Sequence, residues 1–110
     1  PRPHDTGMVT MYTQNLSEFD LHVRAILGYP ITKILTLREG YSTVIKVNNS
    51  ADNDFEYELT GIEKALKLDD VDIRLFGKKK AWNARRLGVI LSSNRASGQK
   101  ARNFISIQKK

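Results

Sequence analysis

One helix is marked at both ends by residues that start and stop helices, and the other elements have to be arranged around it. Ser17 suits the N-cap position, and Asp20 stands three residues later, as in an imperfect capping box. Apolar side chains then recur at helical spacing, at Phe19, Val23, Ile26 and Leu27. Gly28 and Pro30 are residues that commonly end a helix. The pattern predicts a helix from Ser17 to Leu27 with one apolar face.

Short runs with strand character lie on both sides of this helix, and they predict an α+β fold. The runs are Met8–Thr13, Ile31–Leu37, Tyr41–Val47, Val71–Phe76 and Arg86–Ser92. Glu39 and Gly40 predict a hairpin-like turn between the second and third runs. The change of texture places a domain boundary near residues 31–40, followed by a small α+β or barrel-like domain.

Two more helices are predicted in the strand-rich part. Thr60 and Glu63 have the spacing of a capping box. The short helix that follows would turn Ile62, Ala65 and Leu66 inward. Another helix is expected after residue 97, through Ala101, Phe104 and Ile105.

Composition excludes some classes of site and of partner, but it points to the function less specifically than the motifs do. The chain has no cysteine, which excludes disulfides and thiolate metal sites. No apolar run approaches the roughly 18 residues of a membrane-spanning helix. The N-terminus lacks the pattern of a signal peptide. The lack of cysteine is consistent with a cytoplasmic protein, and no membrane binding is expected. The net charge of +6 favours anionic partners, a class that includes both phosphorylated metabolites and RNA.

The strongest local feature is a basic stretch between two predicted strands. It begins at Arg74-Leu75-Phe76-Gly77-Lys78 and ends at Arg85-Arg86-Leu87-Gly88. Because strands flank it, residues 77–84 are predicted to form a loop, with Lys78 on one rim and the paired arginines on the other. Arginine offers a planar fork for two phosphate oxygens, and lysine adds a mobile charge. Gly77 would let the backbone approach a ligand. These cations are therefore candidates for a phosphate site.

Other interpretations of single residues stay open. The basic stretch also fits a solvated loop without a ligand, which composition alone favours. Trp82 among the cations fits a nucleic-acid-stacking surface, although one aromatic residue without a recognisable module gives it little support. Asp5 fits either a ligand for an amine or sugar hydroxyl, or an Asx-turn onto Gly7. His4 and His22 are too few and too far apart to predict a metal site.

Several stretches resemble formate-dependent phosphoribosylglycinamide formyltransferases, a family of the ATP-grasp superfamily. The stretches, in the family's order, are Pro1–Thr10, Leu16–Phe19, Leu21–Ala25, Leu27-Gly28, Arg74–Lys78 and Arg85–Val89. The spacing from Lys78 to the paired arginines is also the family's spacing. Residues 38–70 and 93–110 resemble the family only in general texture. Where the family usually has proline and then an acidic, glycine-rich turn, this chain has Lys79–Ala84.

The resemblance implies an enzyme of de novo purine biosynthesis. The family uses ATP and Mg²⁺ to activate formate, through formyl phosphate, and transfers the formyl group to the amine of phosphoribosylglycinamide. The positions that bind this substrate fall on Asp5, Lys78, Arg85 and Arg86. Arg2 matches an arginine near the reacting acyl phosphate and is a catalytic candidate. No metal ligand is expected in this chain and no cofactor is expected to bind it alone. The full enzyme is expected to be a homodimer without specific nucleic-acid binding.

The same resemblance implies a division of the chain. Residues 1–37 would be the last strand and helix of an ATP-grasp domain, and residues 38–110 a small β-rich, barrel-like C-terminal domain. Because the chain begins inside the first motif, we expect the C-terminal part of a larger enzyme, whose metal-binding glutamates and nucleotide-binding lysines precede Pro1. Such a chain would be inactive alone. The alternatives are a basic nucleic-acid-binding module and an interaction module with a degenerate site.

Overall fold

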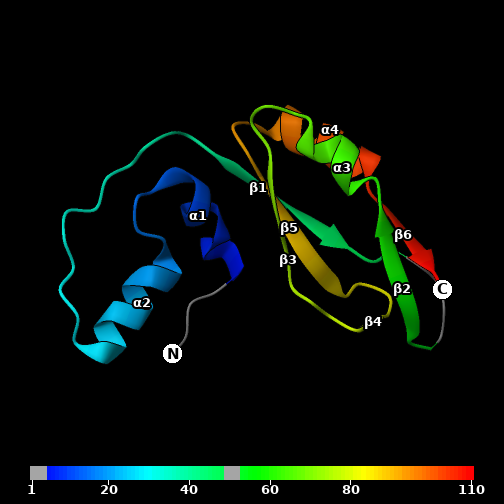
Figure 1. Ribbon diagram of the computed structural model, residues 1–110, viewed down its shortest axis with the longest axis horizontal. Helices are drawn as coiled ribbons and strands as arrows, with labels where there is room; N and C mark the ends of the chain where they lie inside the picture. The colour runs from blue at the N-terminus through cyan, green and yellow to red at the C-terminus, as the bar shows by residue number, and fades with distance from the viewer. Residues whose placement is uncertain (1–4, 49–52) are drawn as a thin grey trace.

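The computed structural model describes residues 5–48 and 53–110, and it shows an α+β chain (Figure 1). The N-terminal part contains η1 (Asp5–Val9), α1 (Thr10–Thr13) and α2 (Glu18–Leu27). The elements that follow are β1 (Tyr41–Lys46), β2 (Phe55–Thr60), α3 (Ile62–Leu66), β3 (Asp72–Leu75), β4 (Lys80–Ala81), β5 (Arg86–Ser92), α4 (Arg95–Phe104) and β6 (Ser106–Lys109). In Figure 1, α1 and α2 lie to one side of the strands, and the segment that joins α2 to β1 runs around the outside.

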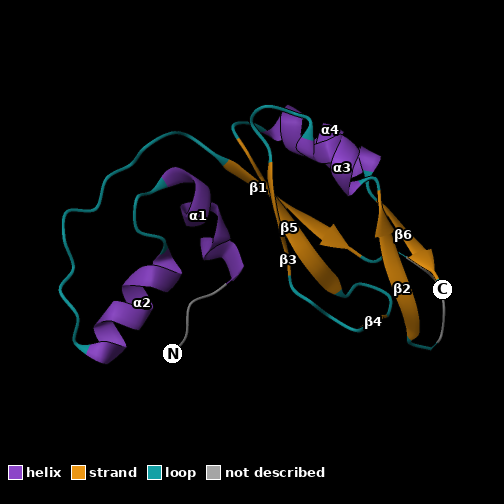
Figure 2. Cartoon of the chain, viewed as in Figure 1, coloured by secondary structure: helices purple, strands orange, loops and turns teal. Residues whose placement is uncertain are grey.

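The strands form two three-stranded sheets in which all pairs are antiparallel (Figure 2). The order is β1-β5-β3 in one sheet and β4-β2-β6 in the other. β5 is the central strand of the first sheet, and every residue from Leu87 to Ser92 is buried. The α+β class is confirmed. No pairing between the two sheets is found among the described strands, so a barrel-like closure stays a prediction.

The larger hydrophobic core joins both sheets to α3 and α4. Its buried residues are Ile45, Val47, Phe55, Ala65, Ala81, Leu87, Ile90, Ala101 and Ile105. The helix α4 comes close to the first sheet because Gly98 has no side chain: a Cβ there would lie 2.4 Å from Oγ1 of Thr43. The C-terminal helix is therefore seated directly on β1.

A smaller cluster attaches the N-terminal part to the first sheet. Its buried residues are Tyr12, Val89 and Leu91, with Met8, Met11 and Phe76 packed against them. Side chains alternate along a strand, so Val89 and Leu91 face away from Ile90, which belongs to the larger core. β5 thus contributes to one core on each of its faces.

Tyr12 joins the N-terminal part to the first sheet by polar contacts as well as by its apolar packing in the smaller cluster. Its hydroxyl donates to the backbone carbonyl of Asp70 at 2.9 Å. The guanidinium of Arg38 lies 3.8 Å from the centre of its ring, and Nε of Arg38 donates to its carbonyl at 2.7 Å. The carboxylate of Asp70 accepts hydrogen bonds from Ser93 and Ser97, which lower the pKa of Asp70. One residue pair, Tyr12 and Asp70, therefore ties the N-terminal part to the turn before β3.

The predicted helix from Ser17 to Leu27 is confirmed as α2, with both predicted ends. The Ser17 hydroxyl accepts the N–H of Asp20 at 3.1 Å, and the Asp20 carboxylate accepts the N–H of Ser17 at 3.0 Å, a complete capping box. The hydrogen bonds from Ser17 lower the pKa of Asp20. Gly28 ends the helix with a left-handed φ of 68°.

The predicted strand Met8–Thr13 is wrong, because this run is helical as the end of η1 and all of α1. Its apolar residues alternate loosely, but Met8, Met11 and Tyr12 also have the i, i+3, i+4 spacing of a helix. That spacing turns all three toward the smaller cluster. The hydroxyl of Thr10 supports the turn by donating to the carbonyl of Gly7 at 2.6 Å.

The predicted strand Ile31–Leu37 is also wrong: the segment makes a single bridge, from Thr36 to Gln14. The side-chain amide of Asn15 holds this segment by bonding two of its backbone groups, at 2.6 and 2.9 Å. The hairpin-like turn at residues 39–40 is absent, since β1 pairs with β5 and not with this segment.

Among the elements after residue 40, those with a clear strand or helix pattern in the sequence lie close to their predicted positions. β1, β3 and β5 lie within the predicted runs, and the helix expected after residue 97 is confirmed as α4, which begins at Arg95 and ends at Phe104. The short helix α3 has Gly61 at its N-cap instead of Thr60. Ala65 is buried as predicted, whereas Leu66 is 49% exposed, so its inward placement was wrong. β2 and β6 were missed. Phe55, Tyr57 and Leu59 of β2 do alternate with polar residues, a strand signal that was overlooked, whereas β6 is mostly polar.

Gly61 is a point where a side chain cannot be accommodated. Its φ is 85°, and a Cβ would lie 1.7 Å from the carbonyl oxygen of Phe104 at the end of α4. We predict that Gly61→Ala lowers the free energy of unfolding by roughly 3 kcal/mol or more, because a left-handed strain and a backbone clash combine. Gly77 is the matched control, with φ of 69° and open space around it. Gly77→Ala should cost only about 1–2 kcal/mol. Urea unfolding curves measure both, and equal losses would contradict the clash.

The apolar face predicted for α2 is present and uncovered. No residue of α2 is fully buried. The exposed apolar residues of α2 and the following segment, each 42% to 69% exposed, are Val23, Ile26, Leu27, Tyr29, Ile31, Ile34, Leu35 and Leu37. A patch of this size is unusual on a monomeric protein surface.

We predict that this patch makes the chain bind the dye 8-anilinonaphthalene-1-sulfonate or self-associate at high concentration. Ile26→Glu should reduce both, because a charge in the patch opposes apolar contact. Leu66→Glu on α3 is the control, since Leu66 is also exposed but lies outside the patch. Dye fluorescence and sedimentation velocity give the measurement. A similar reduction in the two variants would show that the patch has no special part.

Candidate functional site

The predicted phosphate site lies on the connection between two paired strands. β3 and β5 are antiparallel neighbours, with Leu75 opposite Gly88. The connection, residues 76–85, leaves the sheet at Phe76 and returns at Arg85. It was predicted as a simple loop, but it contains β4, which pairs with β2 in the other sheet. The connection therefore bridges the two sheets.

Several backbone bonds hold this connection. The N–H of Ala84 donates to the carbonyl of Val47 at 2.9 Å, and the N–H of Val47 donates to the carbonyl of Arg85 at 2.8 Å. Ala84 has a left-handed φ of 70°, which is uncommon for a residue with a side chain. On the other rim, the Tyr57 hydroxyl donates to the carbonyl of Lys78 at 2.5 Å. Both rims are thus anchored to neighbouring strands.

The side chains of the three predicted cations differ in their surroundings. The Arg85 guanidinium stacks on the ring of Trp82, 3.7 Å from its centre, and Nη1 donates to the carbonyl of Lys80 at 2.6 Å. Arg86 begins β5 opposite Lys46, next to a break in the strand register, and is exposed. Lys78 is exposed on the opposite rim. That the three side chains converge on one anion stays a prediction.

The other predicted site residues lie at the N-terminus. Arg2 and His4 lie outside the described residues, and Asp5 begins η1. Across residues 5–48 and 53–110, no three histidine, cysteine or carboxylate residues form a group that could hold a metal ion. No helix in this part of the chain is long and apolar enough to span a membrane.

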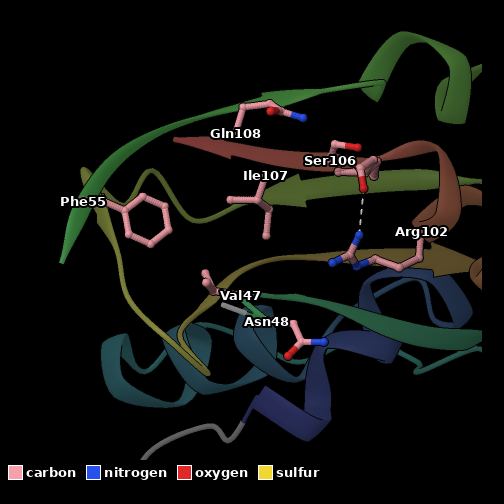
Figure 3. A pocket seen from close by; sticks show the side chains of 8 residues that line it. Val47, Asn48, Phe55, Arg102, Ser106, Ile107 and Gln108 are labelled. Carbon is pink, nitrogen blue, oxygen red and sulfur yellow. Dashed lines mark hydrogen bonds between the residues drawn. The ribbon is translucent and has the colours of Figure 1, made fainter. Parts of the chain in front are cut away.

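Two pockets are lined by residues other than the predicted cations. One, of about 310 Å³, is lined by Val47, Asn48, Phe55, Arg102, Ile105, Ser106, Ile107 and Gln108 (Figure 3). Figure 3 shows the Arg102 guanidinium on its wall, where it donates to the carbonyls of Ile105 and Lys46 at 2.8 and 3.3 Å. Arg102 thereby holds the end of α4 to β1, which is a structural role. No sequence pattern pointed to this residue.

The second pocket, of about 360 Å³, lies between the start of α2 and β3. It is lined by Met11, Gln14, Asn15, Ser17, Phe19, Asp20 and Arg74. Asp20 already accepts the capping bonds of α2, and Arg74 forms an exposed ion pair with Asp72 at 3.1 Å. Its charged groups therefore already have partners within the fold.

Comparison with known proteins places the chain in one family. The family model described as PurT, C-terminal, matches residues 40–104. The formate-dependent phosphoribosylglycinamide formyltransferase of Trichormus variabilis is 55% identical over 92 residues, which cover 84% of this chain and 23% of the relative. The protein of the same name from Geobacter metallireducens is 48% identical over 103 residues, covering 94% of this chain and 25% of the relative. The chain thus spans about a quarter of the length of these curated relatives.

Two solved structures have the same arrangement. N5-carboxyaminoimidazole ribonucleotide synthetase from Thermotoga maritima aligns with a TM-score of 0.83 at 22% identity, over all of this chain and 32% of that one, which shows the fold alone. Glycinamide-RNase-transformylase T from Mycobacterium tuberculosis aligns with a TM-score of 0.66 at 27% identity, over 94% of this chain and 29% of that one. With a family model that covers more than half of its residues, the chain belongs to the PurT C-terminal family.

Proposed function

We propose that this chain provides substrate-binding residues to an enzyme that formylates phosphoribosylglycinamide with formate and ATP, in de novo purine biosynthesis. The observation that carries the proposal is the 48% to 55% identity, over most of the chain, with proteins named for that reaction. The proposal includes a cytoplasmic location and a homodimeric full enzyme.

The proposed role of the basic connection is to bind the phosphate of the substrate. Lys78, Arg85 and Arg86 would act as its ligands, because these cationic residues belong to the two rims of a connection whose backbone is anchored. Asp5 would hold the amine or a sugar hydroxyl, and Arg2 would stabilise the charge that develops on the acyl phosphate. Binding one end of the substrate firmly leaves its amine in place for reaction, which is a large part of catalysis in such transfers.

ATP and Mg²⁺ supply the activation of formate in the proposed reaction. The described residues offer no group that fits a metal ion, so we assign no step of that activation to them. The proposal places these ligands in the part of the relatives that the chain does not span. It also divides the chain at residues 1–37, the end of an ATP-grasp domain, and residues 38–110, a small domain whose two sheets enclose one core like an incomplete barrel. The family match from residue 40 onward supports this division.

Nucleic-acid binding is the less supported alternative. It needs Trp82 as a free stacking platform, but one face of that ring is already covered by the Arg85 guanidinium. The basic surface alone would give only weak binding that salt abolishes.

We predict that Arg86→Ala weakens binding of phosphoribosylglycinamide to this chain by about 10- to 100-fold, as expected when one charged hydrogen-bonding partner is removed. Lys79→Ala is the matched control, because Lys79 is an exposed cation of the same connection outside the family motif. Titration followed by ¹H–¹⁵N NMR measures both affinities and shows which amides move. Equal losses in the two variants would mean that the connection is only a solvated basic surface.

We also predict that the purified 110-residue chain does not consume ATP in the presence of formate and phosphoribosylglycinamide. The reason is that no group of three histidine, cysteine or carboxylate residues that could hold the metal is found among its described residues, and the proposal places the metal ligands in the part of the relatives that the chain does not span. Release of ADP, measured by a coupled assay, is the readout. ADP release above the background of a heat-treated sample would refute this assignment of roles.

A further inference from the structure

Trp82 is the single tryptophan of the chain, and the family resemblance assigns it no role. It follows β4 directly and is 44% exposed. The guanidinium of Arg85 lies over its ring at 3.7 Å. Large aromatic side chains normally bury their surface, so a half-exposed tryptophan that carries a cation on its face calls for an explanation.

The backbone fixes this stacking. Ala81, the residue before Trp82, is fully buried and pairs with Phe55 of β2, so the start of the turn cannot move freely. The N–H of Arg85 donates to the carbonyl of Trp82 at 3.0 Å, which closes a four-residue turn. Within this turn Ala84 has a left-handed φ of 70°. Trp82 and Arg85 are therefore held together by the turn that they begin and end.

The Arg85 guanidinium is restrained on two sides. Its face lies on Trp82, and one N–H points to the carbonyl of Lys80 at 2.6 Å. A guanidinium binds phosphate through a planar fork of donors, so a fixed plane also fixes the direction from which an anion can be bound. An arginine that is held in advance loses less freedom on binding than one on a mobile side chain.

We propose that Trp82 is a positioning residue that holds Arg85 ready to bind a phosphomonoester. The inference rests on the proposed function, because it concerns the same phosphate site. Trp82 does not contact the phosphate, and it acts only through the orientation of Arg85. The ligand class is a sugar phosphate with a terminal monoester group.

The test uses the whole chain and ribose 5-phosphate as the probe, with affinity measured by ¹H–¹⁵N NMR titration. The Nε–Hε signal of Arg85 reports the stacking directly, because the tryptophan ring current shifts it upfield. Trp82→Leu should abolish this shift and weaken binding by about two- to fivefold. Trp82→Tyr keeps an aromatic face and should recover most of the shift and of the affinity. Unchanged signals from β1 and α4 show that the variants are folded.

A double-mutant cycle separates positioning from general support of the turn. Arg85→Gln should weaken binding by about tenfold, and Trp82→Leu should have no further effect once Arg85 is replaced. A similar loss from Trp82→Leu in both backgrounds, or an equal loss in Trp82→Leu and Trp82→Tyr, would overturn the positioning role. So would unchanged affinity in Trp82→Leu beside a loss in Arg85→Gln, although the phosphate site would then stand. If the unmodified chain shows the upfield Arg85 signal but does not bind the probe, the proposed function fails, and the role of Trp82 fails with it.

Discussion

The central strand β5 is the element on which the other parts of the fold depend. It pairs with β1 on one side and β3 on the other, and its buried residues contribute to both hydrophobic clusters. Gly88 makes the pairing with β3 possible at this distance, since a Cβ there would lie 2.6 Å from the carbonyl of Arg74. A single buried strand thus holds the C-terminal helices on one face and the N-terminal helices on the other.

This arrangement also determines where the basic connection lies. Arg86 is the first residue of β5, and Arg85 precedes it with its carbonyl bound to Val47. The backbones of the two arginines are therefore placed by the core strand, whereas the side chain of Arg85 is oriented by Trp82 of the loop. Lys78, by contrast, is held through the Tyr57 hydroxyl and the second sheet. The distance between the two rims consequently depends on how the two sheets are packed around the larger core.

Local sequence patterns predicted the helices and strands that are stabilised by residues close to them in the sequence. α2 could be predicted because Ser17, Asp20 and Gly28 cap it within its own residues, and β5 because its apolar run is continuous. β6 could not, because it has one apolar residue and its partner β2 lies about 50 residues away, and β2 was overlooked although its apolar and polar residues alternate. The run from Met8 to Thr13 was misread because its apolar residues fit both a loose strand alternation and a helical spacing, and only their shared packing in the smaller cluster decides for the helix. The phosphate-binding candidates were predicted from motif spacing, yet the stacking of Arg85 on Trp82 depends on a positive φ at Ala84, which no sequence rule assigns to alanine.

The unusual composition of residues 79–84 can be understood from the same constraints. In this connection the backbone is held at three places outside the loop itself: by β2 through Ala81, by Val47 through Ala84, and by Tyr57 through Lys78. Side chains between these anchors can change without moving the rims, because no anchor uses them. A loop of lysines and one tryptophan can therefore replace a different turn and still present Arg85 and Arg86 from the same edge of β5. What such a replacement can alter is how firmly Arg85 is oriented, since the face on which it lies is supplied by the loop.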